Sequence, residues 1–281
     1  MRKTRLIAAL GIAAAAAVAL TGCNSGAPGA APSEEATEDT VWFTVADPKP
    51  EVADSPTVKT ITDNGKVRVG VKEDQPNLGY LDPTTNERSG FDVDIARWIA
   101  ASLGYDEKDI EFQAIPSENR EQSIENGDID YYVGTFSITD GRKERISFAG
   151  PYFVTGQGLL VAADNDEITG KDSLTADTIV CSATGSTSIQ RIKAETPAKT
   201  EEFQKYSECV EALKNGSVDA VTTDEAILIG YAAQDPDNLK VVGDVFSEER
   251  YGIGLKKGDT AFAEFINTML TDGGDIWTAI F

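Results

Sequence analysis

The sequence predicts an α/β protein in which two similarly built lobes share one cleft. Short apolar strands alternate with amphipathic helices from Val67 onward, a pattern typical of sheets with parallel pairing. A helix that ends on Asn-Gly and leads into a strand occurs twice, at 124–130 and 213–219. A length of 281 residues also favours two domains. We therefore expect two lobes that present their strand ends to a common cleft.

The first half of the pattern predicts two strands and two helices. Residues 67–71 alternate with the period of a strand, and 91–103 carry apolar residues at helical spacing before Gly104, a suitable helix stop. A second helix is expected over 118–126, where Gly127 ends it. A buried strand is then expected over 129–133.

The second half repeats this order. A strand is expected over 178–182, and it runs into the small residues 184–188 and a helix from Ile189. Small hydroxyl residues at a helix start leave backbone N–H groups free for an anion, although simple N-capping explains them equally well. Residues 252–258 lack the spacing of a nucleotide-binding glycine loop and predict a strand followed by a turn.

The repeated segment with Asn-Gly also indicates two candidate ligand residues. Eight residues beyond its glycine, the first copy has Thr135 and the second has Asp224. Both are expected just past the carboxyl end of a strand. In open α/β sheets, ligands bind at that edge.

Composition excludes several classes of function. The chain has 47 acidic and 25 basic side chains and no histidine, for a formal net charge of −22. Without histidine there is no Ser-His-Asp triad and no His-ligated zinc. The excess of acid argues against binding nucleic acid, which depends on Lys and Arg. We expect no metal, no cofactor, no catalytic residues and a monomer.

The N-terminus predicts export and a lipid anchor. A basic start is followed by the apolar run 6–20, which is too short to span a membrane and suits a signal peptide. It leads into Leu-Thr-Gly-Cys, which looks like a bacterial lipobox with Cys23 as the acylated residue. The alternative is an ordinary secretory signal with a chance cysteine. We expect a signal peptide over 1–22 and a protein anchored on the extracytoplasmic face of the cell membrane.

Residues 23–56 are rich in Ala, Pro, Ser and Glu, and their composition predicts a flexible acidic tether. Trp42 and Phe43 are the exception, since they could dock on the folded body. Farther along, Cys181 and Cys209 could form a disulfide in an exported chain. That bridge would stabilise the fold by about 3 kcal/mol. The alternative is two buried thiols.

Six motifs occur in a fixed order: GFDVDIA at 90–96, NGDID at 126–130, SITDGR at 137–142, FAGPY at 148–152, GST at 185–187 and VDAVTTD at 218–224. Together they resemble the family 3 solute-binding proteins of ABC importers, which take up polar amino acids. Three more look like the glutamate-binding subfamily of Gram-positive bacteria: DQP at 74–76, PSENR at 116–120 and SEERYGIG at 247–254. The positions of Cys181 and Cys209 match that subfamily too.

The resemblance implies a type II periplasmic-binding-protein fold, in which two α/β lobes joined by two crossing strands close on a ligand. Lobe 1 would comprise 57–153 plus 253–281, and lobe 2 would comprise 154–252. The implied partners are an amino acid and the permease and ATPase subunits of an importer. Members of the family usually continue past a segment like 272–277. An incomplete chain and a lobe 1 without its last packing element both stay open as explanations for the end at Phe281.

The resemblance assigns the ligand's α-carboxylate to Arg142, five residues after Ser137. A guanidinium fork matches a carboxylate bidentately. Thr187, with Ser186, would donate to the same carboxylate from lobe 2. The alternative for Arg142 is a surface charge, because it begins the charged run 142–145.

The same resemblance assigns the α-ammonium to oxygen atoms of Thr135 and Ser137 and to the counter-charge of Asp224. A second carboxylate on the ligand needs a second cation. The candidates are Lys72, which closes the first strand, and Arg120, just after Ser117. Tyr206 would reach the ligand from lobe 2. The alternative for Arg120 is an exposed place on an amphipathic helix.

These residues suit recognition better than catalysis. Asp92 and Asp94 look like a carboxylate pair for acid–base work, but by the resemblance they belong to a helix start, where acids favour the dipole. We therefore expect a binding protein for L-glutamate or aspartate. Two alternatives are an enzyme on the same scaffold, similar to the dehydratases of cyclic acids, and a sensory lipoprotein without a transporter.

Overall fold

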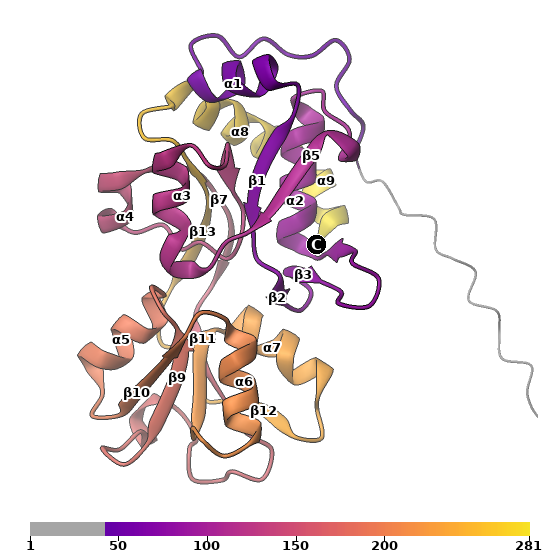
Figure 1. Cartoon of the computed structure of the whole chain (residues 1–281). Helices are drawn as coiled ribbons and strands as arrows, with labels where there is room; N and C mark the ends of the chain where they lie inside the picture. The colour runs from indigo at the N-terminus through magenta and orange to yellow at the C-terminus, as the bar shows by residue number, and fades with distance from the viewer. Residues whose placement is uncertain (1–42) are drawn as a thin grey trace, which may run out of the picture. The chain divides into compact units, whose positions relative to one another are not determined.

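The computed structural model describes residues 43–281, which belong to one compact unit. Their strands form two five-stranded sheets and one small sheet (Figure 1). The first large sheet has the order β5 (Ile110–Ala114), β1 (Val67–Val71), β6 (Tyr131–Tyr132), β13 (Glu249–Leu255) and β7 (Ser147–Thr155). The second has the order β10 (Lys199–Phe203), β9 (Ile179–Ala183), β11 (Ala220–Asp224), β8 (Gln157–Ala162) and β12 (Leu239–Val242). The predicted two-lobed α/β fold is confirmed.

Lobe 1 is built on the first sheet, where β1 runs parallel to both β5 and β6. Its core is apolar, with Val69, Ile95 and Tyr131 fully buried. The small sheet β2 (Asp74–Gln75), β3 (Gly79–Leu81) and β4 (Arg88–Ser89) links β1 to the next helix. The helices of this lobe are α1 (Pro56–Asn64), α2 (Phe91–Ser102), α3 (Arg120–Asn126), α4 (Asp140–Arg145), α8 (Thr260–Asp272) and α9 (Gly274–Ile280), with the 3-10 turns η1 (Glu107–Asp109) and η2 (Ser117–Asn119).

Lobe 2 is built on the second sheet, in which β9 runs parallel to β10 and β11. It carries the helices α5 (Thr187–Glu195), α6 (Tyr206–Lys214) and α7 (Glu225–Gln234), and the turn η3 (Lys171–Ser173). The expected disulfide between Cys181 and Cys209 is present and joins β9 to α6. Both cysteines are fully buried, so the bridge lies within the core of this lobe.

Two connections carry the chain between the sheets. Strand β7 of the first sheet leads directly into β8 of the second, and β12 of the second returns the chain to β13 of the first. Strands β7 and β13 pair antiparallel from Ser147↔Leu255 to Thr155↔Glu249. The boundaries predicted between the lobes fall inside these two strands (Figure 1).

Several predicted elements differ in extent from those observed. The strand expected over 129–133 is reduced to the two residues of β6, because the Asp130 carboxylate, at 2.7 Å, accepts the Arg68 N–H in place of a backbone carbonyl. The helix expected from Ile189 begins at Thr187, since the Ser186 hydroxyl caps it by accepting the Ile189 N–H. The helix expected over 118–126 starts with the tight turn η2 before α3.

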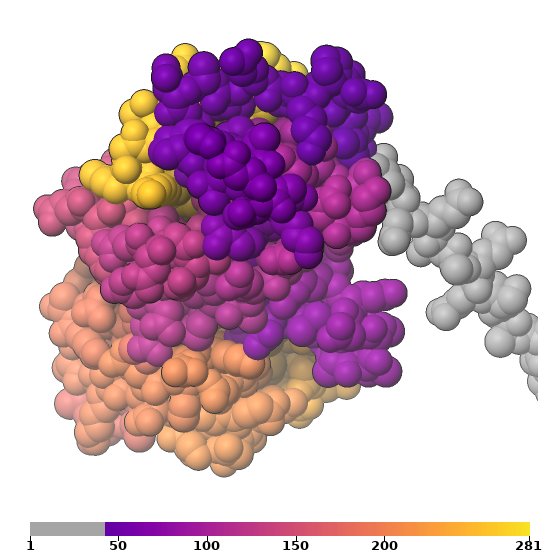
Figure 2. All heavy atoms as spheres, turned by 45° about the horizontal axis from the view of Figure 1, so that its top comes forward, coloured from indigo at the N-terminus to yellow at the C-terminus, as the bar shows by residue number. Residues whose placement is uncertain are grey.

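The described end of the predicted tether, residues 43–56, is anchored on the folded body. Phe43 packs against the core, the Ala46 N–H donates to the Ala101 carbonyl at 2.9 Å, and Ser55 both caps α1 and donates to Asp259 at 2.9 Å. Figure 2 shows this segment (indigo) beside the C-terminal helices (yellow). The composition of 43–56 was therefore a poor guide to its structure, because a few side chains anchor it.

The predicted signal peptide, Cys23, the first part of the predicted tether and Trp42 lie outside the described residues. Within 43–281, no helix is both long and apolar enough to cross a membrane.

Candidate functional site

Three cationic side chains of lobe 1 are buried together: Lys72 at 4%, Arg120 at 3% and Arg142 at 8% exposure. Lys72 follows β1, and its Nζ donates to the Ser117 hydroxyl at 2.6 Å. Burial, and next the charge of Arg120, lowers the pKa of Lys72 to about 7. Buried cations are costly unless an anion pairs with them. The cluster therefore favours an anionic ligand.

Arg142 connects both lobes. Its Nη1 donates to the Ser137 carbonyl at 2.6 Å, its Nη2 to the Gly185 carbonyl of lobe 2 at 3.1 Å, and its Nε to Glu121 at 3.2 Å. The Thr139 hydroxyl caps α4 and so fixes the backbone of Arg142. Burial, followed by repulsion from Arg120, lowers the pKa of Arg142 to about 10. The guanidinium stays positively charged at neutral pH.

Arg120 is the first residue of α3 and points inward, which excludes the exposed alternative. Its Nε donates to the Ser117 carbonyl at 3.0 Å, and its Nη1 reaches the Thr135 carbonyl at 3.4 Å. Its Cζ lies 4.2 Å from the ring centroid of Phe136. Arg120 thus contributes a second fixed guanidinium to the same cluster.

Asp224 supplies the opposite charge from lobe 2. It is the last residue of β11, and the Tyr251 hydroxyl donates to its Oδ2 at 2.7 Å. Its Oδ1 is buried and has no hydrogen-bond partner among residues 43–281. Burial, and next the charge of Glu249, raises the pKa of Asp224 to about 7. An ammonium group beside Oδ1 would supply the missing partner and favour the ionised carboxylate.

Thr135 is held by a buried network that the sequence analysis missed. Its backbone is left-handed at φ 45°, its N–H donates to Asp92 at 2.9 Å, and its hydroxyl bonds the Gln75 amide at 3.0 Å. Asp92 also accepts the Tyr152 hydroxyl at 2.5 Å. A signal was available, because Asp92 shares the apolar face of α2 with Ile95 and Ile99 at i+3 and i+7.

The remaining predicted residues of lobe 2 have partners within the protein. Ser186 caps α5, and the Thr187 hydroxyl donates to Glu249 at 3.2 Å. Tyr206 begins α6 and is buried; burial, and next the charge of Asp224, raises its pKa to about 12. The structure therefore gathers the predicted side chains of both lobes around the cation cluster, with Thr187 directed to Glu249.

Comparison with known proteins agrees with this architecture. A model of the bacterial extracellular solute-binding proteins, family 3, matches residues 67–273.

The chain belongs to this family.

Two curated relatives of this family 3 protein and one solved structure are similar along most of the chain. The glutamate-binding protein GluB of Corynebacterium efficiens is 44% identical over 218 residues, 74% of each chain. The glutamine-binding protein GlnH of Bacillus subtilis is 41% identical over 215 residues, 76% of this chain and 78% of the relative. The structure of an ancestral arginine-binding protein bound to arginine has a TM-score of 0.71 at 34% identity, covering 77% of this chain and 96% of that one.

The two lobes of this solute-binding protein are in direct contact beside the charged cluster. Asp74 of lobe 1 accepts the Ser207 N–H at the start of α6 at 3.2 Å, and its backbone carbonyl accepts the Tyr231 hydroxyl. A Cβ added at Gly185, whose φ is 76°, would lie only 2.7 Å from the Glu118 Cα. These contacts enclose the charges of both lobes between them.

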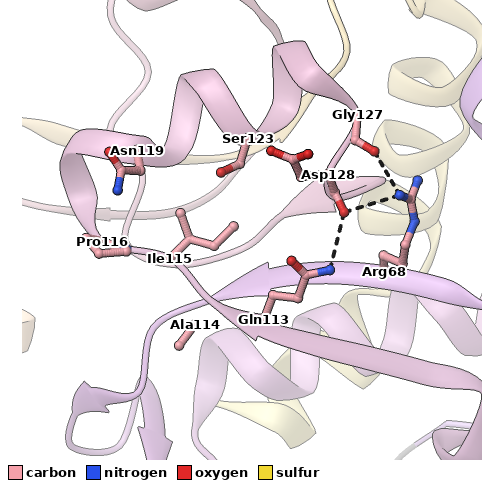
Figure 3. A pocket seen from close by; sticks show the side chains of 9 residues that line it. All are labelled: Arg68, Gln113, Ala114, Ile115, Pro116, Asn119, Ser123, Gly127 and Asp128. Atoms are coloured by element: carbon pink, nitrogen blue, oxygen red, sulfur yellow. Dashed lines mark hydrogen bonds between the residues drawn. The ribbon is translucent and has the colours of Figure 1, made fainter.

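A pocket of about 580 Å³ lies on the surface of lobe 1, apart from the cation cluster (Figure 3). There Arg68 Nη1 donates to the Gly127 carbonyl at 2.8 Å and to the Asp128 carbonyl at 3.2 Å, and Gln113 donates to the latter at 3.2 Å. The charged residues that line this pocket are Arg68 and Asp128, and none of the three cations of the cluster belongs to it. No group of residues suited to a metal ion occurs within 43–281.

Proposed function

We propose that the protein captures L-glutamate, and aspartate as a second ligand, between its lobes and delivers it to an ABC importer. The observation that carries the proposal is the burial of three cations beside Asp224, whose Oδ1 lacks a partner among the described residues. An acidic amino acid has two carboxylates and one ammonium group. Its charges complement this arrangement.

Each charged group of the ligand has a proposed partner. Arg142 binds the α-carboxylate, with Ser186 and Thr187 as donors from lobe 2. Asp224 binds the α-ammonium, together with oxygen atoms of Thr135 and Ser137. Lys72 and Arg120, with Ser117 and Tyr206 beside them, bind the distal carboxylate. A ligand that touches both lobes stabilises their closed arrangement, because an open arrangement lacks half of the contacts.

Charge supports one of the two ligands that the relatives' names suggest. Their sequence identities of 44% and 41% are too close to choose between glutamate and glutamine. A glutamine amide would leave the second positive group without its anion, and an unpaired buried charge is costly. The presence of two cations, Lys72 and Arg120, therefore supports glutamate as the ligand.

The rest of the proposal concerns where the protein acts. The lipobox at residues 20–23 supports acylation of Cys23 and anchoring on the extracytoplasmic face of the membrane. We propose lobes of 57–153 plus 253–281 and of 154–252, hinged within β7 and β13. The role is transport without catalysis, because the charged residues match the ligand's own ionic groups.

Calorimetry with the purified mature chain tests this function. We expect L-glutamate to bind with a Kd of about 1 μM, near −8 kcal/mol, and at least about tenfold more tightly than L-glutamine. Lys143→Ala is a matched control, since this lysine of α4 is exposed and should leave both affinities unchanged. Equal or tighter binding of glutamine would contradict the proposal.

A further inference from the structure

Phe136 lies against both guanidinium groups of the site. Its ring centroid is 4.2 Å from Cζ of Arg120 and 4.8 Å from Cζ of Arg142. Both distances fall within the range of about 6 Å over which a cation is attracted to an aromatic face. The ring itself is fully buried, so water does not weaken the attraction.

The two residues that flank Phe136 each accept a hydrogen bond from a different arginine. The Thr135 carbonyl accepts from Nη1 of Arg120 at 3.4 Å, and the Ser137 carbonyl accepts from Nη1 of Arg142 at 2.6 Å. Three successive residues therefore present a carbonyl, an aromatic ring and a second carbonyl to the two guanidinium groups. Each arginine has its own carbonyl, and the ring is common to both.

This arrangement offsets the repulsion between the two buried guanidinium groups. Two buried positive groups repel each other, and the lowered pKa of Arg142 reports the repulsion from Arg120 after the cost of burial. Glu121 pairs with Nε of Arg142, while Arg120 donates to carbonyl oxygens. The negative face of an aromatic ring attracts cations without adding a formal charge that would compete with an anionic ligand.

The ring is also rigidly supported. The Phe136 carbonyl accepts the Gly252 N–H of β13 at 3.0 Å, and Ser137 bridges to Tyr251 of the same strand. The ring packs edge-on against Phe148, with centroids 5.0 Å apart, and against Tyr132 at 5.4 Å. A group fixed in this way can hold other side chains in place.

We propose that Phe136 is a positioning residue, which holds Arg120 and Arg142 at two separate places so that each meets one carboxylate of a dicarboxylic ligand. The inference rests on the proposed function, because it takes both guanidinium groups as ligand-facing.

The first test compares Phe136→Leu with Phe148→Leu. Both variants remove a ring from one apolar cluster, but Phe148 has no contact with either arginine among the cation–aromatic pairs of residues 43–281. By calorimetry, we expect F136L to bind L-glutamate about tenfold more weakly and to lose most of its preference over L-glutamine. F148L should keep its Kd within about twofold. An unchanged glutamate preference in F136L, or equal losses in both variants, overturns the inference.

A second measurement does not depend on either variant folding. In the NMR spectrum of the wild-type protein without ligand, a ring this close should shift the side-chain Nε–H signals of Arg120 and Arg142 away from their random-coil positions. Arg→Lys substitution of each residue assigns the two signals. Random-coil shifts for either arginine would show that the ring does not hold it, and would overturn the inference.

The two proposals fail in different ways. If wild-type protein binds glutamine as tightly as glutamate, the proposed function is wrong. If wild-type protein prefers glutamate and F136L retains that preference, only the positioning role of Phe136 is wrong.

Discussion

At the scale of single residues, the site is a set of buried charges that are costly without a ligand. Lys72 and Arg142 have lowered pKa values, whereas Asp224 has a raised one, and burial is the main cause for each. Under the proposed function, these residues serve binding at the expense of stability. Removing one of these charges should therefore weaken binding and stabilise the unliganded fold.

Asp224→Asn tests this trade-off. We expect its Kd for glutamate to rise at least about tenfold, because the ammonium group loses its counter-charge. Without ligand, the raised pKa of about 7 means that the folded wild type retains a proton that the unfolded chain loses. The contribution of Asp224 to stability therefore falls as pH rises from about 4 to 7.

The variant should consequently be more stable than wild type at pH 8, by about 2–4 kcal/mol, and nearly equal to it at pH 4. Urea unfolding at both pH values measures the difference. A variant that is less stable than wild type at pH 8 would show that the buried carboxylate stabilises the fold.

At the scale of elements, α2 connects the site to the strand β7. Asp92 in its first turn accepts both the Thr135 N–H and the Tyr152 hydroxyl, and Tyr152 lies in β7. The network thus holds together Thr135, which has a left-handed backbone and is a proposed ligand residue, and the strand β7. Loss of the carboxylate would leave two buried donors unsatisfied.

We expect Asp92→Ala to lower the free energy of unfolding by about 2–5 kcal/mol and to weaken glutamate binding. Asp94 is the matched control: it lies two residues along the same helix, is partly exposed and pairs with Arg97. Asp94→Ala should cost less than about 1 kcal/mol. Equal losses in urea unfolding would mean that Asp92 has no special role.

The sequence predicted elements better than it predicted contacts. Helix α2 was predicted almost to the residue, because its apolar spacing and Gly104 are local signals. Strand β6 was overestimated, since the Asp130 side chain replaces a backbone acceptor. The inward position of Arg120 came from family resemblance, and periodicity alone left it open. The apolar face of α2 indicated that Asp92 is buried, but the partners of Asp92 and Gln75 lie up to 60 residues away, so no local pattern revealed which groups they contact.

At the scale of the whole molecule, contacts between the lobes should set how long a ligand stays bound. Asp74 of lobe 1 accepts the Ser207 N–H and the Tyr231 hydroxyl of lobe 2, and Lys205 pairs with Glu73 at 2.6 Å. An open arrangement would lack these contacts. They stabilise closure without belonging to the proposed set of ligand contacts.

Asp74→Ala should therefore accelerate glutamate dissociation about three- to tenfold, with an association rate within about twofold of wild type. Stopped-flow fluorescence measures both rates. Glu211→Ala is the control, because this exposed side chain lines the same groove between the lobes. A slower association with unchanged dissociation would place Asp74 in the encounter step instead.

The central claim is that two buried guanidinium groups each bind one of the two carboxylates of a single ligand. Calorimetry of Arg142→Ala and Arg120→Ala with L-glutamate and L-glutamine tests it most directly. The account predicts that R142A loses binding of both amino acids, while R120A binds both with similar affinity, because only its preference for the acidic side chain is lost. Equal and mild losses in the two variants would contradict it.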